Sequence, residues 1–317
     1  MSSAGQSAAV AASPARPPVA ANEGGGSLGH VRRLVDERLE LLVPPGDAQP
    51  RNLHLAMRHA LIAPSKRVRP VMCFLIADPG ESLREAALDV GCAIEMVHTA
   101  SLILDDLPCM DDAAMRRQRP TTHVQFGEAT AILAAIALMN RAFGIIAELE
   151  QVPAPVRTRL AAILSDAIGS NGLVAGQEID INGRDGLTDA KPVEQLNWLK
   201  TGVLFVASAE MGAVLRGLDA QQVGAIRSFA RHFGLAFQTA DDLIDQTAKP
   251  AEAGKDVNQD GSKPTLVSLL GIEQARLSCA EHLNLARRAL AEARIDATRL
   301  DELVARVFQT RSTGSAT

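Results

Sequence analysis

Apolar residues recur at intervals of three and four along the chain from His30 onward. This spacing matches the turn of an α-helix and differs from the alternation that a half-buried strand requires. The pattern is clearest at 221–245, where the apolar side chains on one face are Val223, Ile226, Phe229, Phe233, Phe237, Ala240 and Ile244. No series of alternating segments separated by hairpin turns interrupts it. The sequence therefore predicts an all-α protein.

Proline and glycine divide the chain into segments of about 10 to 25 residues, a length that suits the helices of one bundle. The breaks fall at Pro44-Pro45-Gly46, Ala63-Pro64, Asp78-Pro79-Gly80, Pro153-Ala154-Pro155, 183–186 and 249–264. None has the composition of a domain linker, and no repeat of fixed period is present. We therefore predict one helical domain over residues 28–317. Residues 1–27, rich in Ala, Pro, Gly and Ser, are predicted to form a disordered tail.

Charge and cysteine content argue against several classes of protein. The chain carries 37 acidic and 32 basic residues, a net charge of -5, which disfavours binding to nucleic acid or anionic membrane through bulk positive charge. The cysteines, Cys73, Cys92, Cys109 and Cys279, show neither a CxxC pair nor zinc-type spacing, which favours a reducing cytoplasm. The longest unbroken apolar run, 131–139, is shorter than the roughly 20 residues that span a bilayer. We expect no nucleic-acid partner and no stable membrane insertion.

Two clusters of aspartates each adjoin a long apolar segment. They are residues 105–112, at the end of a helix predicted to begin near residue 86, and residues 241–245. Asp241 and Asp245 are one helical turn apart and can flank a cation. Asp105 and Asp111 are six residues apart, so Pro108 must distort the turn if both carboxylates are to converge. Either cluster alone could cap a helix or face solvent, but together they favour Mg²⁺, whose shell is usually completed by water and substrate phosphates.

Basic side chains accompany both clusters. They are Arg116, Arg117 and Arg119 after the first, Lys255 and Lys263 after the second, and the upstream segment Lys66-Arg67-Val68-Arg69. Each group alone is typical of a solvated surface. Beside so many carboxylates, the basic groups indicate a polyanion held partly through metal ions and partly by direct contacts. Diphosphate is the simplest candidate.

With these motifs, the chain resembles the trans-isoprenyl diphosphate synthases, and within them the bacterial short-chain geranylgeranyl and farnesyl diphosphate synthases. The resemblance runs from about Val31 to Leu270 and is carried by KRVRP (66–70), EMVHTASLILDDLPCMDD (95–112), MRRQRPTTH (115–123), GEATAILA (127–134), GQEID (176–180), KTG (200–202), FQTADDLID (237–245) and GKDVNQDGSKPT (254–265). It implies a bundle of the isoprenoid synthase type with a central active-site cavity, in a cytoplasmic homodimer.

The resemblance also implies roles for individual residues. Mg²⁺, as three ions when substrate is bound, would be held by Asp105, Asp111, Asp241 and Asp245. Arg116, Lys200, Thr201, Gln238, Lys255 and Lys263 match positions that contact the allylic diphosphate, and Lys200, Thr201 and Gln238 are the expected catalytic side chains. Lys66, Arg69, His98 and Arg117 match the isopentenyl diphosphate site. A lone helical histidine is more often structural, but His98 lies two helical turns before Asp105 on the same face.

The reaction implied by the family is ionisation followed by condensation. Mg²⁺ and cationic side chains offset the charge on the departing diphosphate, and the double bond of isopentenyl diphosphate attacks the allylic cation. Allylic primers of C5 to C15 are expected. The small Ala100 and Ser101 and the absence of tyrosine favour a C20 product. A C15 product remains open, because these residues could instead permit close helix packing while Met139 sets the pocket floor.

Several positions depart from the common family pattern. Ser65 and Gln118 stand where glycine is frequent, Ala113-Ala114 replaces acidic residues, and Ala135-Ile136 replaces Gly-Asp. The last two variants resemble geranylgeranyl diphosphate synthases of bacterial carotenoid pathways.

Two other classes remain as alternatives. A non-catalytic partner subunit is disfavoured by the intact aspartates and basic residues. A class I terpene cyclase is disfavoured because that class generally carries an Asn/Ser/Glu metal motif where this chain has Asp241 to Asp245. The Ala-rich segment around 129–147 could form a dimer interface, or it could be internal core.

Overall fold

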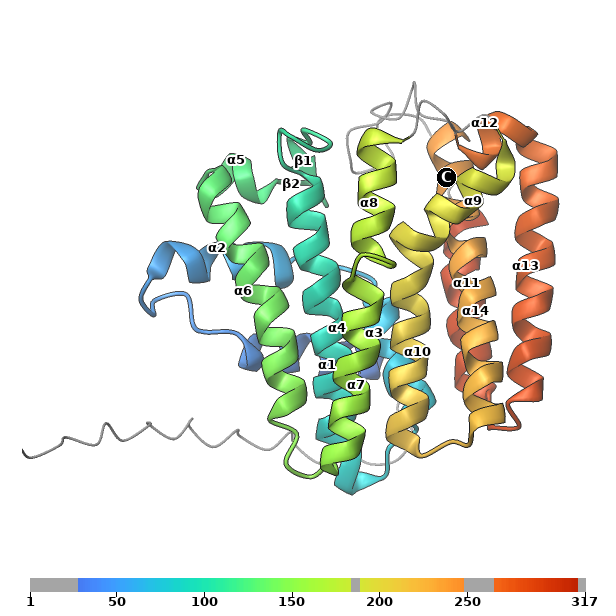
Figure 1. The fold of residues 1–317 in the computed structure, drawn as a ribbon, viewed down its shortest axis with the longest axis horizontal. Helices are drawn as coiled ribbons and strands as arrows, with labels where there is room; N and C mark the ends of the chain where they lie inside the picture. The colour runs from blue at the N-terminus through green and yellow to red at the C-terminus, as the bar shows by residue number, and fades with distance from the viewer. Residues whose placement is uncertain (1–27, 184–188, 248–264, 313–317) are drawn as a thin grey trace, which may run out of the picture.

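The computed structural model describes residues 28–183, 189–247 and 265–312, which form a bundle of long helices (Figure 1). The elements in order are α1 (Leu28–Leu42), α2 (Arg51–Leu61), α3 (Val68–Ala77), η1 (Glu81–Leu83), α4 (Arg84–Asp105), β1 (Met115–Arg116), β2 (Arg119–Pro120), α5 (Thr122–Phe126), α6 (Glu128–Ala147), α7 (Ala154–Ile168), α8 (Leu173–Asn182), α9 (Ala190–Asn197), η3 (Trp198–Gly202), α10 (Val203–Arg216), α11 (Ala220–Thr247), α12 (Leu266–Leu270), α13 (Ile272–Glu292) and α14 (Thr298–Ser312). The all-α prediction is confirmed.

Some predictions concern residues outside the described ranges. These are the tail at 1–27, the segment 249–264 with Lys255 and Lys263, and the side chain of Asp245.

The predicted breaks coincide with helix ends. Helix α3 ends at Ala77, directly before the Asp78-Pro79-Gly80 turn, and Asp78 itself takes a positive φ of 40°. Helix α7 begins at Ala154, directly after Pro153. Proline lacks a backbone N–H and has a fixed φ, so it is tolerated at a helix start and not in the interior.

Helix α4 lies at the centre of the core. Its side chains from Ala86 to Val97 are all buried, and α3, α6 and α10 pack around it (Figure 1). Toward its carboxyl end, from His98 to Asp105, one face becomes partly accessible. Most of helix α4 is therefore buried, and its carboxyl end places the first aspartate cluster at the surface.

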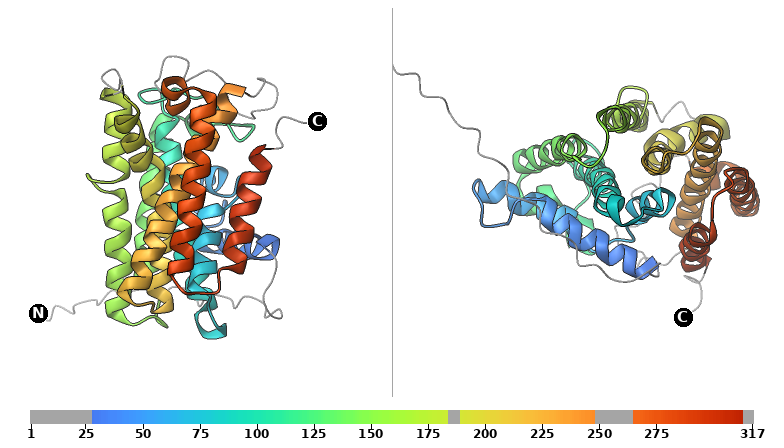
Figure 2. Two further views of the ribbon diagram at one scale, coloured as in Figure 1. Left: turned by 90° about the vertical axis from the view of Figure 1, so that its right-hand side faces the viewer. Right: turned by 90° about the horizontal axis from the view of Figure 1, so that it is seen from below.

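Helix α11 carries the predicted apolar stripe into the same core. Ile226, Phe229 and Phe233 are fully buried. The ring of Phe205 on α10 contacts those of Phe233 and Phe237, with centroids 5.1 and 5.0 Å apart. These contacts fix α11 against α10. Seen from the side and end-on, α6 and α13 lie at opposite ends of the bundle (Figures 1 and 2).

A small hairpin that the helical pattern did not predict follows the first aspartate cluster. Strands β1 and β2 pair antiparallel with Arg116 opposite Arg119. The two residues between them, Arg117 and Gln118, have positive φ values of 51° and 60°. Two consecutive positive φ values are the signature of a type I′ turn.

Three helical segments in the described chain have the length and hydropathy of a membrane span: Glu81–Asp105, Glu128–Ala147 and Ala190–Arg216. In the first and third, 78% of the most apolar window is buried inside the bundle, whereas in the second only 39% is buried. The apolar side chains of the first and third segments are thus mostly buried in the core, while α6 has an exposed apolar face.

Candidate active site

The first aspartate cluster closes the carboxyl end of α4. Beyond Asp105 the chain turns back, because the backbone N–H of Asp111 donates to the carbonyl oxygen of Asp105 at 2.9 Å and that of Asp112 donates to Leu107 at 3.1 Å. A distorted turn around Pro108 was predicted for the case in which Asp105 and Asp111 converge. Burial raises the pKa of Asp105 to about 6; nearby Lys200 opposes this shift, and Asp111 adds to it. The two carboxylates therefore lie close enough to influence each other.

Lys200 reaches the same point from another part of the chain. It lies in η3, a single π-helical turn, a feature often found at functional sites. Its ammonium forms an ion pair with the buried carboxylate of Asp180 on α8, and Nζ lies 3.9 Å from Oδ1 of Asp105. Helix α8 can approach this turn because residue 176 is glycine: a Cβ there would lie 2.8 Å from the backbone nitrogen of Lys200.

The neighbouring Thr201 connects this turn to the second aspartate cluster. Its Oγ1 donates to Oε1 of Gln238 at 2.9 Å, and Nε2 of Gln238 donates to Oδ1 of Asp242 at 2.9 Å. Asp242 is buried, and the adjacent Asp241 is half-buried on α11. Lys200 thus lies beside the first aspartate cluster, and the next residue, Thr201, is linked to the second cluster through Gln238.

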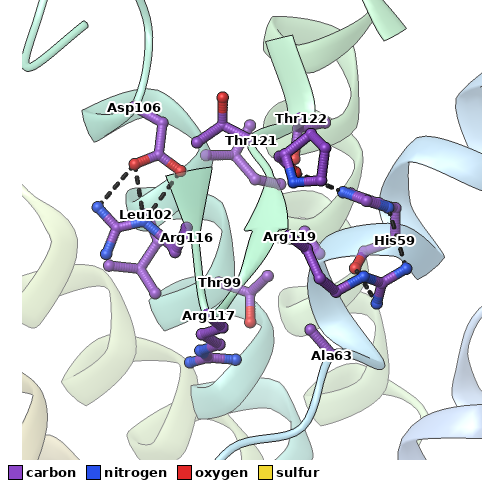
Figure 3. Close-up of a pocket in the computed structure, with 13 residues that line it drawn as sticks. His59, Ala63, Thr99, Leu102, Asp106, Arg116, Arg117, Arg119, Thr121 and Thr122 are labelled. Carbon is purple, nitrogen blue, oxygen red and sulfur yellow. Dashed lines mark hydrogen bonds and ion pairs between the residues drawn. The ribbon is translucent and has the colours of Figure 1, made fainter. Parts of the chain in front are cut away.

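The hairpin carries two arginines with different environments (Figure 3). Nε of Arg116 donates to both carboxylate oxygens of Asp106, at 2.7 and 2.9 Å. Arg117 points away from this pair, toward the base of the pocket that Thr99 and Ala63 also line (Figure 3). Arg119 instead contacts His59, with Nη2 3.2 Å from Nδ1 of that ring. The hairpin therefore places Arg116 beside the first aspartate cluster. It places Arg117 in a second group of cationic side chains, which includes Arg69.

That second group lies near His98. Burial lowers the pKa of His98 well below its usual value, and the nearby positive charges of Arg69 and Arg117 lower it further. The imidazole is therefore neutral at physiological pH. Arg69 is itself buried, with Cζ 4.2 Å from the centroid of the Phe205 ring. Three of the four residues predicted to bind isopentenyl diphosphate are thus brought together, while Lys66 lies more exposed, in a hollow that Arg306 also lines.

Sequence reasoning missed several side chains that hold the predicted ones in place. Asp180 pairs with Lys200, Asp106 with Arg116, and Asp242 with Gln238. Glu95 binds Arg67, with Oε1 2.8 Å from Nη1. Each is a carboxylate within or beside an apolar helical segment. The sequence could have predicted that these carboxylates are paired, because a charged side chain is rarely buried without a partner.

The arrangement of donors fits magnesium only when a further ligand completes the site. Among the described residues, no three His, Cys, Asp or Glu side chains form a cluster that could hold a metal ion. Asp105 and Asp111 nevertheless offer hard carboxylate oxygens on one short turn. Mg²⁺ is commonly bound by one or two carboxylates together with water and substrate phosphates. The donors therefore match a metal shared with a diphosphate better than a closed protein cage.

Comparison with known proteins identifies the family. A family profile described as polyprenyl synthetase matches residues 50–306. The chain belongs to the polyprenyl synthetase family. Over 261 residues it is 42% identical to geranylgeranyl diphosphate synthase of Pantoea ananas, covering 82% of this chain and 85% of that one. It is 40% identical over 255 residues to farnesyl diphosphate synthase of Geobacillus stearothermophilus, covering 79% and 86%.

Solved structures of two enzymes have the same fold as this chain. A geranyltransferase from Helicobacter pylori, complexed with magnesium and isoprenyl diphosphate, superposes with a TM-score of 0.80 at 28% identity, covering 89% of this chain and 95% of that one. An FPP/GFPP synthase from Zymomonas mobilis, in its apo form, gives a TM-score of 0.76 at 34% identity, covering 90% and 97%. The predicted resemblance, fold class and enzyme class, a trans-prenyltransferase, are confirmed.

Proposed function

We propose that this prenyltransferase condenses isopentenyl diphosphate with allylic diphosphates of C5 to C15 and releases geranylgeranyl diphosphate, the C20 product. The observation that carries this proposal is the presence of two cationic groups near the end of α4. One is Lys200 beside Asp105; the other is Arg69 and Arg117 around His98. Two separate cationic groups suit two diphosphate substrates. The similarity to curated geranylgeranyl diphosphate synthases supports the C20 product.

The allylic diphosphate is assigned to the group that joins the two aspartate clusters. Arg116, Lys200, Thr201 and Gln238 bind it from this side, and the proposal extends to Lys255 and Lys263. Lys200 is already fixed by Asp180, so it can bind negative charge on the departing diphosphate with little reorganisation. Thr201 and Gln238 orient each other through their hydrogen bond. These residues favour breaking of the carbon–oxygen bond to the diphosphate.

Magnesium is assigned to Asp105, Asp111 and Asp241, with Asp245 as a further ligand. When bound, Mg²⁺ supplies Lewis-acid stabilisation of the leaving diphosphate. The family profile and the magnesium-bound Helicobacter pylori relative support this dependence. We propose three ions in the substrate complex. Asp106 is not assigned to the metal, because both of its carboxylate oxygens accept hydrogen bonds from Arg116.

Isopentenyl diphosphate is assigned to Lys66, Arg69, His98 and Arg117. Neutral His98 can donate a hydrogen bond to a phosphate oxygen without adding to the repulsion among the arginines. This site holds the substrate double bond toward the allylic carbon that becomes cationic. The diphosphate released from the allylic substrate then accepts the proton lost from the condensed carbocation.

The C20 product is supported by the wall of α4 beneath Asp105. Ser101 is half-buried on the partly accessible face, and its Oγ donates to the carbonyl oxygen of His98 at 2.9 Å. Ala100, in contrast, is fully buried in the core. Ser101 is therefore the residue of the pair that can limit chain growth, and its small side chain leaves room for a longer product. Met139, half-buried on α6, is the alternative residue that could form the floor of the product pocket.

A homodimer is also part of the proposal. Helix α6 exposes Ile132, Leu133 and Ile136 on one face, with exposed fractions of 40%, 56% and 57%. An apolar face of this kind on a long helix is a common protein interface. We assign it to a second copy of this chain, in a cytoplasmic enzyme of a carotenoid-type pathway. The alternative of internal core is contradicted for these side chains by their exposure, although Ala131, Ala134 and Ala135 do face the core.

The two substrate sites can be tested separately by steady-state kinetics. Lys66→Ala should raise KM for isopentenyl diphosphate, and Arg116→Ala should raise KM for the allylic substrate. A variant that altered the KM of the other substrate instead would contradict the assignment.

A further inference from the structure

Arg67 lies between two proposed ligands of isopentenyl diphosphate but is turned into the protein. Its side chain is only 2% exposed. All three guanidinium nitrogens donate hydrogen bonds: Nη1 to Oε1 of Glu95 at 2.8 Å, Nε to Oδ1 of Asp36 at 2.8 Å, and Nη2 to the carbonyl oxygens of Leu61 at 2.8 Å and Ala63 at 3.2 Å. Because these donors are committed within the protein, Arg67 does not bind the diphosphate directly.

The backbone at Arg67 needs this support. Its φ of 48° lies in the left-handed region, which is unfavourable for a residue with a side chain. Such a conformation persists only where the surroundings enforce it. Here the left-handed residue immediately precedes α3, so it sets how the chain turns between Lys66 and Arg69. Loss of the contacts of Arg67 would therefore release the positions of both neighbours.

Glu95 ties this turn to the helix that carries His98. Its side chain is also only 2% exposed, and it lies on α4, one turn before His98. Ser65, which stands where the family frequently has glycine, joins the same network: its Oγ donates to Oε1 of Glu95 at 3.3 Å and accepts from the backbone N–H of Arg67 at 3.3 Å. The separation between the 66–69 segment and His98 is thus set through one buried carboxylate.

We propose that Glu95 and Arg67 are positioning residues, which hold Lys66 and Arg69 in register with His98 for the diphosphate of isopentenyl diphosphate without contacting it. This inference rests on the proposed assignment of Lys66, Arg69 and His98 to that substrate. A buried ion pair often adds little net stability compared with an apolar replacement. A role in fixing one arrangement of the binding segment accounts for the pair better than a role in stability alone.

The chain contains a matched control. Arg38 on α1 binds Asp89 on α4, with Nε 2.6 Å from Oδ1 and the two side chains 1% and 0% exposed. This pair is as buried as Arg67–Glu95 and joins the same two helices that Asp36 and Glu95 occupy. Its hydrogen bonds run from Nε and Nη2 of Arg38 to the two carboxylate oxygens of Asp89, so the pair links α1 to α4. A purely structural effect should therefore appear equally in both pairs.

The test compares Arg67→Lys and Glu95→Gln with Arg38→Lys by measuring both KM values, kcat and Tm. We expect Arg67→Lys and Glu95→Gln to raise KM for isopentenyl diphosphate at least tenfold, with KM for the allylic substrate and kcat at saturation changed less than threefold. Arg38→Lys should lower Tm without moving either KM. Lys66→Ala, assayed in parallel, should also raise KM for isopentenyl diphosphate.

The outcomes separate this inference from the proposed function. If Lys66→Ala raises KM for isopentenyl diphosphate while Arg67→Lys and Glu95→Gln only lower Tm, as Arg38→Lys does, the positioning role is wrong. An equal rise in both KM values also contradicts it. An unchanged KM in Lys66→Ala instead refutes the substrate assignment on which the role depends. Should the buried variants not fold, Asp36→Asn replaces them, since Asp36 is 46% exposed; a rise confined to KM for isopentenyl diphosphate supports the role, and no rise overturns it.

Discussion

Nζ of Lys200 lies 3.9 Å from Oδ1 of Asp105, although the two residues come from helical segments far apart in the chain. The same ammonium is held by Asp180, which is buried on α8. A cation is therefore fixed beside the first aspartate cluster before substrate arrives. In the proposed reaction, this cation would stabilise the negative charge that develops on the departing diphosphate.

The first prediction concerns this cation. Lys200→Gln should lower kcat about 100-fold or more, because a preorganised group that stabilises the leaving diphosphate is lost. Asp180→Asn should lower kcat less, since Lys200 remains but is held less firmly. Steady-state assays with saturating substrates measure both. Lys191→Gln, at an exposed lysine on α9, is the control; near-normal kcat in Lys200→Gln would contradict the assignment.

The second prediction concerns pH. The pKa of Asp105 is raised to about 6, chiefly by burial, and a carboxylate must lose its proton to bind metal. Above pH 7 the group is already ionised, so magnesium affinity should be nearly constant. As pH falls below 6 the proton competes, and affinity should fall by about tenfold for each pH unit. Magnesium titrations of activity between pH 5 and 8 measure this; an affinity that is flat down to pH 5 would show that Asp105 is not a ligand.

Much of this architecture was predictable because each motif has a local physical cause. The stripe through Ile226, Phe229 and Phe233 predicted α11, and those side chains are buried. Convergence of Asp105 and Asp111, six residues apart, was predicted to need a distorted turn, and the chain does turn back there. Such predictions depend only on residues near one another in sequence.

The supporting contacts were not predictable in the same way. Asp180 meets Lys200, and Glu95 meets Arg67, only because distant helices pack together. The hairpin was also missed, since a strand of two residues has no detectable alternation. In addition, Ala100 and Ser101 look equivalent in sequence, and only the orientation of α4 separates the buried one from the accessible one.

The third prediction concerns strain in the hairpin turn. Gln118 has a φ of 60°, a conformation that costs a residue with a side chain about 1 kcal/mol and costs glycine little. Gln118→Gly should therefore raise Tm by about 2 °C in a domain of this size. Gln125→Gly, within α5, is the matched control and should lower Tm, because glycine weakens a helix. A lower Tm in Gln118→Gly would show that the turn is not strained.

The fourth prediction concerns product length. Ser101→Phe should place a ring on the accessible face of α4 below Asp105 and shift the product from C20 toward C15. Ala100→Phe should instead overpack the core, at a cost of about 1 to 3 kcal/mol, and appear as a loss of Tm. Chromatography of the dephosphorylated products, together with thermal unfolding, distinguishes the two. An unchanged product in Ser101→Phe would move the floor of the pocket to another helix, with Met139 as the next position to test.

The most direct test of the proposed function is a product assay on the purified full chain. Labelled isopentenyl diphosphate is supplied with a C5, C10 or C15 allylic diphosphate, in magnesium or in chelator, and the products are separated by chain length. We predict magnesium-dependent formation of the C20 diphosphate from each primer and no product in chelator. Condensation that stops at C15 would refute the proposed product, and failure to condense any primer would contradict the proposed function itself.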